Sequence, residues 1–313
     1  MDKVRAPRNR TITLTKTDKT IYAKELVRIT SPATLACLEN KIANQDIFSL
    51  LDFLPKKFVD LLILDPPYNI DKIFKSTAFK RKTTAEYAKW FEDWFVQLLP
   101  ALKNTASVYV CCEWLTSTAV HLVLEKYLKV RNRITWEREK GRGAKRNWKN
   151  ASEDIWFATV SDDYTFNVNA VKLKRRVIAP YTDSSGAPKD WQATPRGRFR
   201  ITHPSNLWND ITVPFWSMPE NTDHPTQKPE KLLAKLILAS SNKGDFVFDP
   251  FAGAGSSLVA ARKLGRRFLG VEIDKTYCLL AAKRLHLAGL NPQIQGYRDA
   301  TFYERNTLNL KLK

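Results

Sequence analysis

Apolar residues along the chain follow two alternating patterns: short continuous runs, and longer runs with a helical period. The continuous runs occupy residues 57–65 (KFVDLLILD), 107–114 (SVYVCCEW), 245–249 (DFVFD) and 266–274 (RRFLGVEID). Short apolar runs of this kind are typical of strands buried on both faces of a parallel sheet. We therefore expect these segments to be strands of one sheet.

The segments between these runs carry apolar residues at steps of three and four. In residues 83–102 these steps place aromatic and leucine side chains on one face, and Thr83 and Glu86 have the spacing of a capping box. Strands that alternate with such helices predict an α/β fold around a mainly parallel central sheet. Further helices are expected at residues 116–128, after Pro229, and at residues 256–265 and 275–289.

Two parts of the chain lack this alternation. Residues 1–30 are basic and are interpreted as a peripheral N-terminal arm, whereas residues 141–222 combine prolines and tryptophans with little periodicity. Long stretches without a period are usually functional or disordered, and the interleaved tryptophans argue against simple disorder. We therefore expect one half of the sheet domain at 31–140, an insertion at 141–222 and the other half at 223–313.

The charge of the chain narrows the class of partner. There are 51 Lys and Arg against 32 Asp and Glu, a net charge of +19, which favours a polyanion and nucleic acid first. An anionic membrane surface is the alternative, but no basic helix with a clean apolar face supports it. No apolar run approaches the ~20 residues of a membrane span, and the N-terminus lacks an apolar signal segment, so we expect a cytoplasmic protein without a membrane partner.

The cysteines and histidines do not form a metal or disulfide pattern. The four cysteines include no C-x-x-C pair, and the four histidines are scattered. We therefore expect neither a zinc site nor a disulfide framework, and no metal.

The sequence DPPY, residues Asp65–Tyr68, follows the first apolar run directly. Pro66 and Pro67 fix the backbone and remove two N–H donors, so the Asp65 carboxylate and the Pro66 carbonyl both act as acceptors. Tyr68 adds a flat face for stacking. Two acceptors beside an aromatic ring form a receptor for a planar heterocycle with an amino group, and they can shift its nitrogen towards a nucleophilic form.

The sequence FDPFAGAGSSL, residues 248–258, combines the end of a strand, two glycines and the start of a helix. Ligands of open parallel sheets bind at such carboxyl ends, and Glu272, at the end of the next strand, suits the hydroxyls of a ribose. A dinucleotide-binding dehydrogenase is the competing interpretation. However, Leu258 replaces its third glycine and the loop begins Asp-Pro-Phe, so a ligand with a sugar edge and no pyrophosphate fits better.

These motifs, in this order, resemble the S-adenosylmethionine-dependent amino-methyltransferases of DNA in their permuted β-class arrangement. DPPY comes first, the basic irregular stretch follows, and HPTQKPEKLL, DPFAGAGSS and GVEID come last. The resemblance covers residues 42–290. It implies a Rossmann-like methyltransferase fold with permuted motif order, in which 31–140 is the catalytic half, 141–222 a target-recognition insertion and 223–313 the cofactor-binding half.

The resemblance assigns a role to each motif residue. Asp65, Pro66, Pro67 and Tyr68 would receive a base that is flipped out of duplex DNA, with Tyr68 stacked on it. Gln45 replaces the glycine that usually precedes the acid near the cofactor adenine. The residues that would bind S-adenosylmethionine are Asp46, Thr226 and Lys228 (the last two near its carboxylate), Asp249, Phe251, Gly253, Gly255 and Glu272 (on the ribose).

Basic residues of the irregular segments would contact the DNA. Between Arg131 and Lys149 alone there are eight Lys and Arg against two acids. Contacts to phosphates would make binding strongly dependent on salt. The candidates are Lys80, Arg81, Lys140, Arg142, Lys145, Arg146, Arg175, Arg176, Arg196 and Arg198.

Asp as the first motif residue favours N6 of adenine, because the family more often has Ser there when N4 of cytosine is the target. A cytosine-N4 enzyme, an RNA or protein methyltransferase and an inactive DNA-binding protein are the alternatives. A homodimer and a cognate restriction endonuclease as partners also stay open. Association with the nucleoid follows from a DNA substrate.

Overall fold

The computed structural model describes two large sheets, a separate pair of short strands, and the helices that pack on the large sheets. The described residues are 6–69, 72–74, 77–79, 81–142, 146–178, 180–195 and 197–304; of 72–74, 77–79 and 139–142 only the backbone is described.

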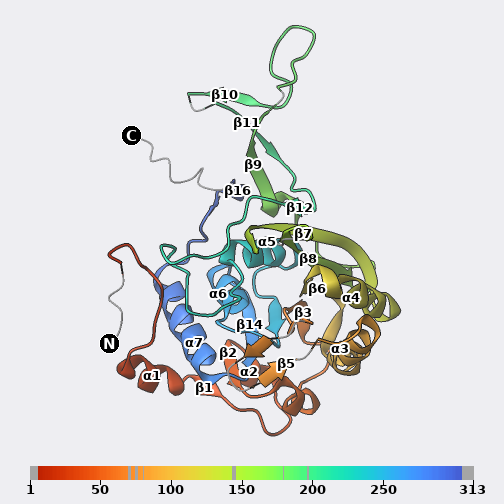
Figure 1. Ribbon diagram of the computed structural model, residues 1–313, viewed down its shortest axis with the longest axis vertical. Coiled ribbons are helices and arrows are strands. Elements are labelled where there is room, and N and C mark those ends of the chain that lie inside the picture. Colours follow the sequence, from red (N-terminus) through yellow and green to blue (C-terminus); the bar gives the residue numbers. More distant parts are fainter. Residues whose placement is uncertain are drawn as a thin grey trace.

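The central sheet runs through the middle of the molecule (Figure 1). Its first six strands are parallel, and β8 then runs antiparallel to both of its neighbours. This confirms the predicted α/β fold with a mainly parallel sheet. In spatial order the strands are β1 (Leu26–Val27), β2 (Lys41–Asn44), β14 (Arg267–Glu272), β13 (Phe246–Asp249), β3 (Val59–Leu64), β6 (Leu102–Cys112), β8 (Asn150–Thr159), β7 (Lys129–Arg142) and β12 (Leu207–Trp208).

Helices cover both faces of the central sheet, because successive strand residues point to opposite sides. Leu62 and Leu64 of β3 pack under α3 (Thr84–Leu98) and α4 (Trp114–Tyr127). Leu61 and Ile63 face the core formed with α5 (Glu230–Ser240), α6 (Ser256–Lys263) and α7 (Lys275–Leu290). The capping box predicted at Thr83 and Glu86 is present at the start of α3.

Part of a second sheet, residues 172–202, extends away from this body as a projecting arm (Figure 1). Its base packs on α5, where Val171 and Leu173 meet Ala234 and Leu238. The order is β10 (Gln192–Thr194), β11 (Gly197–Thr202), β9 (Lys172–Arg176), β16 (Thr301–Tyr303) and β15 (Tyr297–Arg298). A small separate hairpin joins β4 (Lys72–Phe74) to β5 (Thr77–Phe79).

The structure corrects the expected boundaries in three places. The boundary at residue 141 falls within β7, and β8 belongs to the central sheet rather than to the insertion, because it pairs with both β6 and β7. The end of the chain does not serve the sheet domain alone, since β16 pairs with β9 of the arm.

The expected N-terminal arm is in fact packed on the body over its described part. Helix α1 (Lys16–Ala23) contacts α7, and Tyr22 is buried in the core of that face. Lys283 of α7 donates to Asp18 at 2.7 Å and to the Thr13 carbonyl at 2.9 Å. Short helix α2 (Leu35–Leu38) then leads into β2.

Candidate active site

A cavity of about 650 Å³ opens at the carboxyl ends of β3, β13 and β14. It brings together the two motifs that are far apart in sequence, because β3 and β13 are parallel neighbours with Phe248 opposite Leu62. All four residues of DPPY line it. So do seven of the eight residues predicted to bind the cofactor: Asp46, Thr226, Lys228, Asp249, Phe251, Gly253 and Glu272.

Asp65 is held by a buried lysine. The Lys228 ammonium donates to the two Asp65 carboxylate oxygens at 2.8 and 2.7 Å and to the Tyr68 hydroxyl at 2.9 Å. Burial alone would lower the pKa of Lys228, but Asp65 and Glu153 raise it above its ordinary value, so the ammonium stays charged. Lys228 was expected near the carboxylate of a cofactor, and the structure instead places its ammonium on the Asp65 carboxylate.

The backbone of DPPY is fixed from outside the motif. The Tyr87 hydroxyl of α3 donates to the Pro67 carbonyl at 3.1 Å. Pro66 and Pro67 both line the cavity. A rigid turn of this kind keeps the acceptor groups in place before a ligand enters.

Glu153 and Arg138, which were not predicted from the sequence, join Asp65, Tyr68 and Lys228 in one cluster of polar side chains. Glu153 of β8 is buried and accepts from the Tyr68 hydroxyl at 3.1 Å, and it lies 3.2 Å from the Lys228 ammonium. Arg138 of β7 donates to its other oxygen at 2.5 Å. The only sequence signal was an acid at the start of an apolar strand, and its position at the site follows from the antiparallel placement of β8.

The cofactor-type loop is organised by two carboxylates. Asp249 accepts from the Phe251 N–H at 3.0 Å and from the Ser257 hydroxyl. Glu272 accepts from the N–H groups of Gly253 and Asp274 at 2.9 and 2.7 Å. Burial raises the pKa of Asp249 to about 7 and raises that of Glu272 as well. Both carboxylates thus shape the loop in addition to lining the cavity.

The two glycines of this loop are required by packing inside the protein. Gly253 has φ +52°, and a Cβ there would lie 2.9 Å from the His224 ring; Gly255 has φ +75°, and its Cβ would lie 2.6 Å from that of Ala281 on α7. Gly255 is not among the residues that line the cavity. The expectation that both glycines admit a ligand therefore needs correction for Gly255, whose role is the close approach of α7.

At the other end of the cavity, Asp46 is exposed and caps a short 3₁₀ turn by accepting from the Phe48 N–H at 3.1 Å. Gln45, which stands where a glycine was expected, is buried and bonds both the N–H and the carbonyl of Ile29, at 2.7 and 3.1 Å. The Gln45 side chain therefore supports the chain behind the cavity and leaves Asp46 facing it.

The lining fits a nucleoside-containing ligand. Phe48, Trp90 and Phe251 supply aromatic surface, and Asp46 and Glu272 supply acceptors for hydroxyl groups. Thr226 supplies a hydroxyl, and Lys228, whose ammonium is held by Asp65, adds positive charge beside it. This donor and acceptor set suits the adenosine and the amino-acid part of S-adenosylmethionine.

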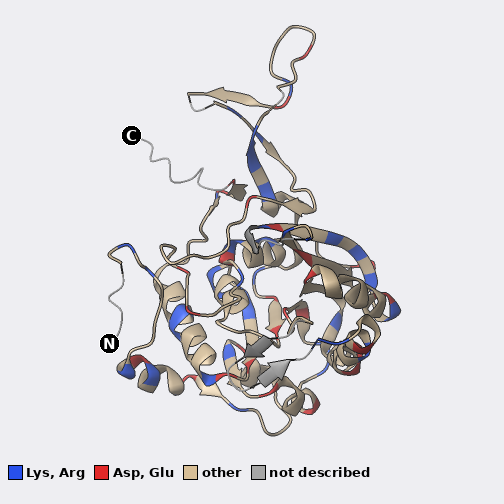
Figure 2. Ribbon diagram, viewed as in Figure 1, with Lys and Arg blue, Asp and Glu red and all other residues tan. Residues whose placement is uncertain are grey.

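Apart from Lys80 and Arg81, which precede α3 in the chain, the predicted DNA-contacting residues belong to the hairpin of β7 and β8 or to the projecting arm. Figure 2 shows Lys and Arg along β7 and β9. Lys80, Lys145 and Arg196 lie outside the described residues, as do the side chains of Lys140 and Arg142. Arg81, Arg146, Arg176 and Arg198 are exposed, and Arg198 lies over the ring of Trp191 at 5.0 Å.

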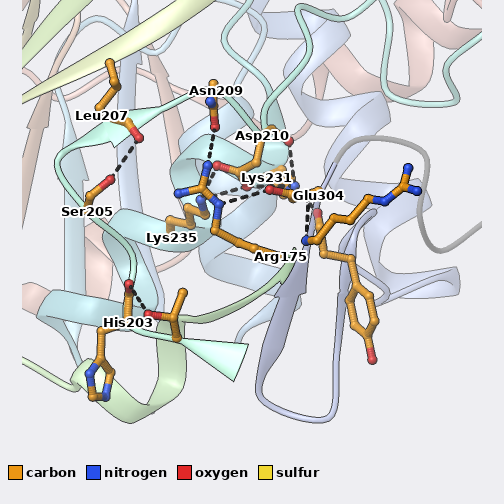
Figure 3. A network of polar contacts seen from close by, with 12 residues as sticks. Arg175, His203, Ser205, Leu207, Asn209, Asp210, Lys231, Lys235 and Glu304 are labelled. Atoms are coloured by element: carbon orange, nitrogen blue, oxygen red, sulfur yellow. Dashed lines mark hydrogen bonds and ion pairs between the residues drawn. The ribbon is translucent and has the colours of Figure 1, made fainter. Parts of the chain in front are cut away.

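Arg175 differs from these residues because it joins the arm to the body (Figure 3). Its guanidinium donates to Glu304 at 3.0 Å and to Asn209 at 3.4 Å. Beside it the fully buried Lys235 ammonium donates to both oxygens of Asp210, at 2.7 and 2.8 Å. The structure therefore gives Arg175 a contact within the protein at the position where a DNA contact was expected.

We expect the buried Asp249 carboxylate to lower the unfolding free energy when it is ionised, and the pH dependence of that free energy tests this. Its raised pKa means that the folded state binds more protons than the unfolded state between about pH 4 and 7, so unfolding free energy falls as pH rises through this window. We expect Asp249→Asn to remove this contribution, on the order of a few kcal/mol. Urea unfolding of both proteins from pH 4 to 8 measures this contribution as the difference between their unfolding free energies, which cancels the contributions of the other titrating groups.

No helix among the described residues is long and apolar enough to cross a membrane, and in the same part of the chain no cluster of three or more His, Cys, Asp or Glu could hold a metal ion.

Known proteins of similar sequence or fold include DNA methyltransferases. The DNA adenine methyltransferase YhdJ of Escherichia coli is 33% identical over 255 residues, which cover 79% of this chain and 83% of that protein. Among solved structures, the complex of M1.HpyAVI with SAM matches with a TM-score of 0.53 at 24% identity, covering 78% and 98% of the two chains. The cytosine-N4-specific PvuII DNA methyltransferase matches with a TM-score of 0.57 at 15% identity, covering 83% and 88%.

The two solved structures show the fold, and family membership comes from the sequence. The DNA methylase family of N6 and N4 methyltransferases matches residues 59–283, which include both motifs and every strand from β3 to β14. The chain belongs to this DNA methylase family.

Proposed function

We propose that the protein transfers a methyl group from S-adenosylmethionine to the N6 amine of an adenine in duplex DNA. The observation that carries the proposal is the shared cavity. It places the acceptor Asp65 in the same enclosed space as Glu272 and the loop at Phe251. An amine receptor and a nucleoside site in one cavity are what methyl transfer to a base requires.

The residues of the chain orient the amine rather than activate the methyl group. S-adenosylmethionine would supply an electrophilic methyl on sulfur: the S–CH3 bond breaks as the N–CH3 bond forms, the sulfur leaves as a thioether, and one amine proton is lost to water. Asp65 and the Pro66 carbonyl accept the two N–H bonds of the amine, which turns the nitrogen lone pair out of conjugation and towards the cavity. Tyr68 offers its ring to the face of the base, in the manner of stacking platforms.

Binding of the cofactor would use the opposite part of the cavity. Glu272 would hold the ribose hydroxyls, Asp46 would lie near the adenine, and Phe251 and Gly253 would form the loop around them. Thr226 would face the amino-acid part. Lys228 can reach that part only by releasing some of its contacts with Asp65, so we place its main contact on Asp65.

Adenine is favoured over cytosine by two points. The first motif residue is Asp, and the relative YhdJ is named as an adenine methyltransferase. The test is incubation with duplex DNA and methyl-labelled S-adenosylmethionine, followed by nucleoside digestion and mass spectrometry. Labelled N6-methyladenine is expected. Labelled N4-methylcytosine would contradict the choice of base, and unlabelled DNA would contradict the function.

We propose that the exposed cations of the projecting arm, defined as residues 172–202, and of the β7–β8 hairpin bind DNA phosphates. Arg176 and Arg198 are carried by adjacent strands of the arm, and Arg146 lies in the hairpin. We also propose that the protein acts in the cytoplasm at the nucleoid, because its proposed substrate is DNA. We also propose a homodimer and a cognate restriction endonuclease as partners. Light scattering tests the homodimer. A cutting assay on unmethylated DNA tests the endonuclease.

We expect Arg176→Ala to weaken DNA binding similarly for all sequences and to reduce the salt slope of log K by about 0.9, the value for one phosphate contact. Titrations at several salt concentrations by fluorescence anisotropy measure both quantities. Lys19→Ala, on the exposed face of α1, serves as the control and should leave the slope unchanged. A loss confined to one target sequence would instead indicate that Arg176 contacts a base.

A further inference from the structure

The Tyr68 hydroxyl lies between two carboxylates. It is 3.0 Å from an Asp65 oxygen and 3.1 Å from a Glu153 oxygen, and it also accepts from the Lys228 ammonium at 2.9 Å. A phenol has one proton, so it can donate to only one of the two carboxylates at a time. Burial, Asp65 and Glu153 raise the pKa of Tyr68 well above its usual value, so the phenol keeps that proton.

The choice between the two acceptors matters for the reaction. If Tyr68 donates to Asp65, it occupies a lone pair that the amine of the substrate needs. The Lys228 ammonium competes for the same oxygens at 2.7 and 2.8 Å. An acceptor other than Asp65 must therefore take up these donors when the base enters.

Glu153 is placed and held to do this. Its side chain is 6% exposed, and one oxygen faces both Tyr68 and Lys228. The other oxygen accepts from Arg138 at 2.5 Å, which fixes the orientation of the carboxylate. Arg138 and Glu153 come from the paired strands β7 and β8, in which Glu153 lies opposite Trp136, two residues before Arg138.

We infer that Glu153 is a positioning residue of the methyl transfer: it accepts the hydrogen bond of the Tyr68 hydroxyl and one hydrogen bond of the Lys228 ammonium, and so leaves Asp65 free to accept from the amine. The inference rests on the proposed function, because it concerns the amine acceptor. It assigns no contact between Glu153 and the base.

The test is a double-mutant cycle with Glu153→Gln and Tyr68→Phe. Glutamine keeps the shape of the side chain, but its carbonyl turns to Arg138 and its N–H groups then face Tyr68 and Lys228, where they cannot accept. Phenylalanine keeps the ring but removes the hydroxyl that can donate to either Asp65 or Glu153. Single-turnover rates of all four proteins and their dissociation constants for S-adenosylmethionine are measured.

We expect Glu153→Gln to lower the rate about tenfold in the Tyr68 protein and clearly less in the Tyr68→Phe protein, since coupled neighbours are non-additive. Cofactor affinity should stay within about twofold, which also shows that the variants are folded. The inference would be overturned if Glu153→Gln lowered the rate by the same factor in the Tyr68 protein and in the Tyr68→Phe protein, or if it changed neither rate.

Asp154→Asn is the matched control. Asp154 is the next residue of β8 and is also buried, but its carboxylate accepts from Ser117 and Thr135 at 2.7 and 2.9 Å, away from the cluster. Its rate should match that of the wild type. A wild-type protein that transfers no methyl group would overturn the proposed function, whereas an active wild type with an insensitive Glu153 would overturn only the inference.

Discussion

Replacing Asp65 with alanine is expected to lower methyl transfer about 10³-fold, a loss typical of removing a preorganised group from the reacting centre. The side chain is the one acceptor in DPPY that carries a charge, and without it the Lys228 ammonium also loses its principal partner. Single-turnover assays with labelled S-adenosylmethionine measure the rate, and calorimetry measures cofactor binding, which should persist.

Asp60→Ala provides the comparison on the same strand. Asp60 of β3 forms an ion pair with Lys103 at 2.7 Å, remote from the cavity. We expect this variant to lose some stability and to keep its transfer rate. A fully active Asp65→Ala enzyme would remove Asp65 from the catalytic role.

Replacing Glu272 with alanine is expected to raise the dissociation constant for S-adenosylmethionine about 10- to 100-fold, as when a charged hydrogen-bond partner is lost. Two causes act together. The ribose hydroxyls lose their acceptor, and the N–H groups of Gly253 and Asp274 lose the carboxylate that holds the loop. Calorimetric titration with the cofactor measures the change.

Affinity for DNA in the absence of cofactor should not change in this variant, because Glu272 ends β14 of the central sheet, whereas the exposed cations Arg176 and Arg198 lie in strands of the arm. Glu39→Ala is the control: this partly exposed acid lies 3.7 Å from Arg267 at the start of the same strand. Weakened DNA binding with normal cofactor affinity would show that Glu272 belongs to the DNA-binding end of the cavity and not to the cofactor-binding end.

The parts of the fold that could be predicted are those with a local signal. The apolar runs at β3, β6, β13 and β14 and the periodic helices between them carry their structure in a few neighbouring residues. The arm could not be predicted in this way. Its strand β9 pairs with β16, about 130 residues later, and a pairing of such long range leaves no period in either segment.

The site shows the same division. Asp65 and Glu272 were predictable because each ends an apolar strand, and strand ends of a parallel sheet meet at one edge. The ion pair between Lys228 and Asp65 and the approach of Glu153 depend on the packing of α5 and on the order of β6, β8 and β7. No short stretch of sequence encodes that order, so the partners of Asp65 became visible only in three dimensions.

The pairing of β9 with β16 determines which segments must be moved together when the arm is exchanged between related proteins. A graft of residues 172–202 alone would transplant β9, β10 and β11 without the two strands that complete their sheet, and would separate Arg175 from Glu304. A chimera built from two discontinuous pieces, the arm together with the hairpin of β15 and β16, would transfer the whole sheet. The arm therefore keeps its complete sheet only when two segments, residues 172–202 and the hairpin of β15 and β16, are exchanged together.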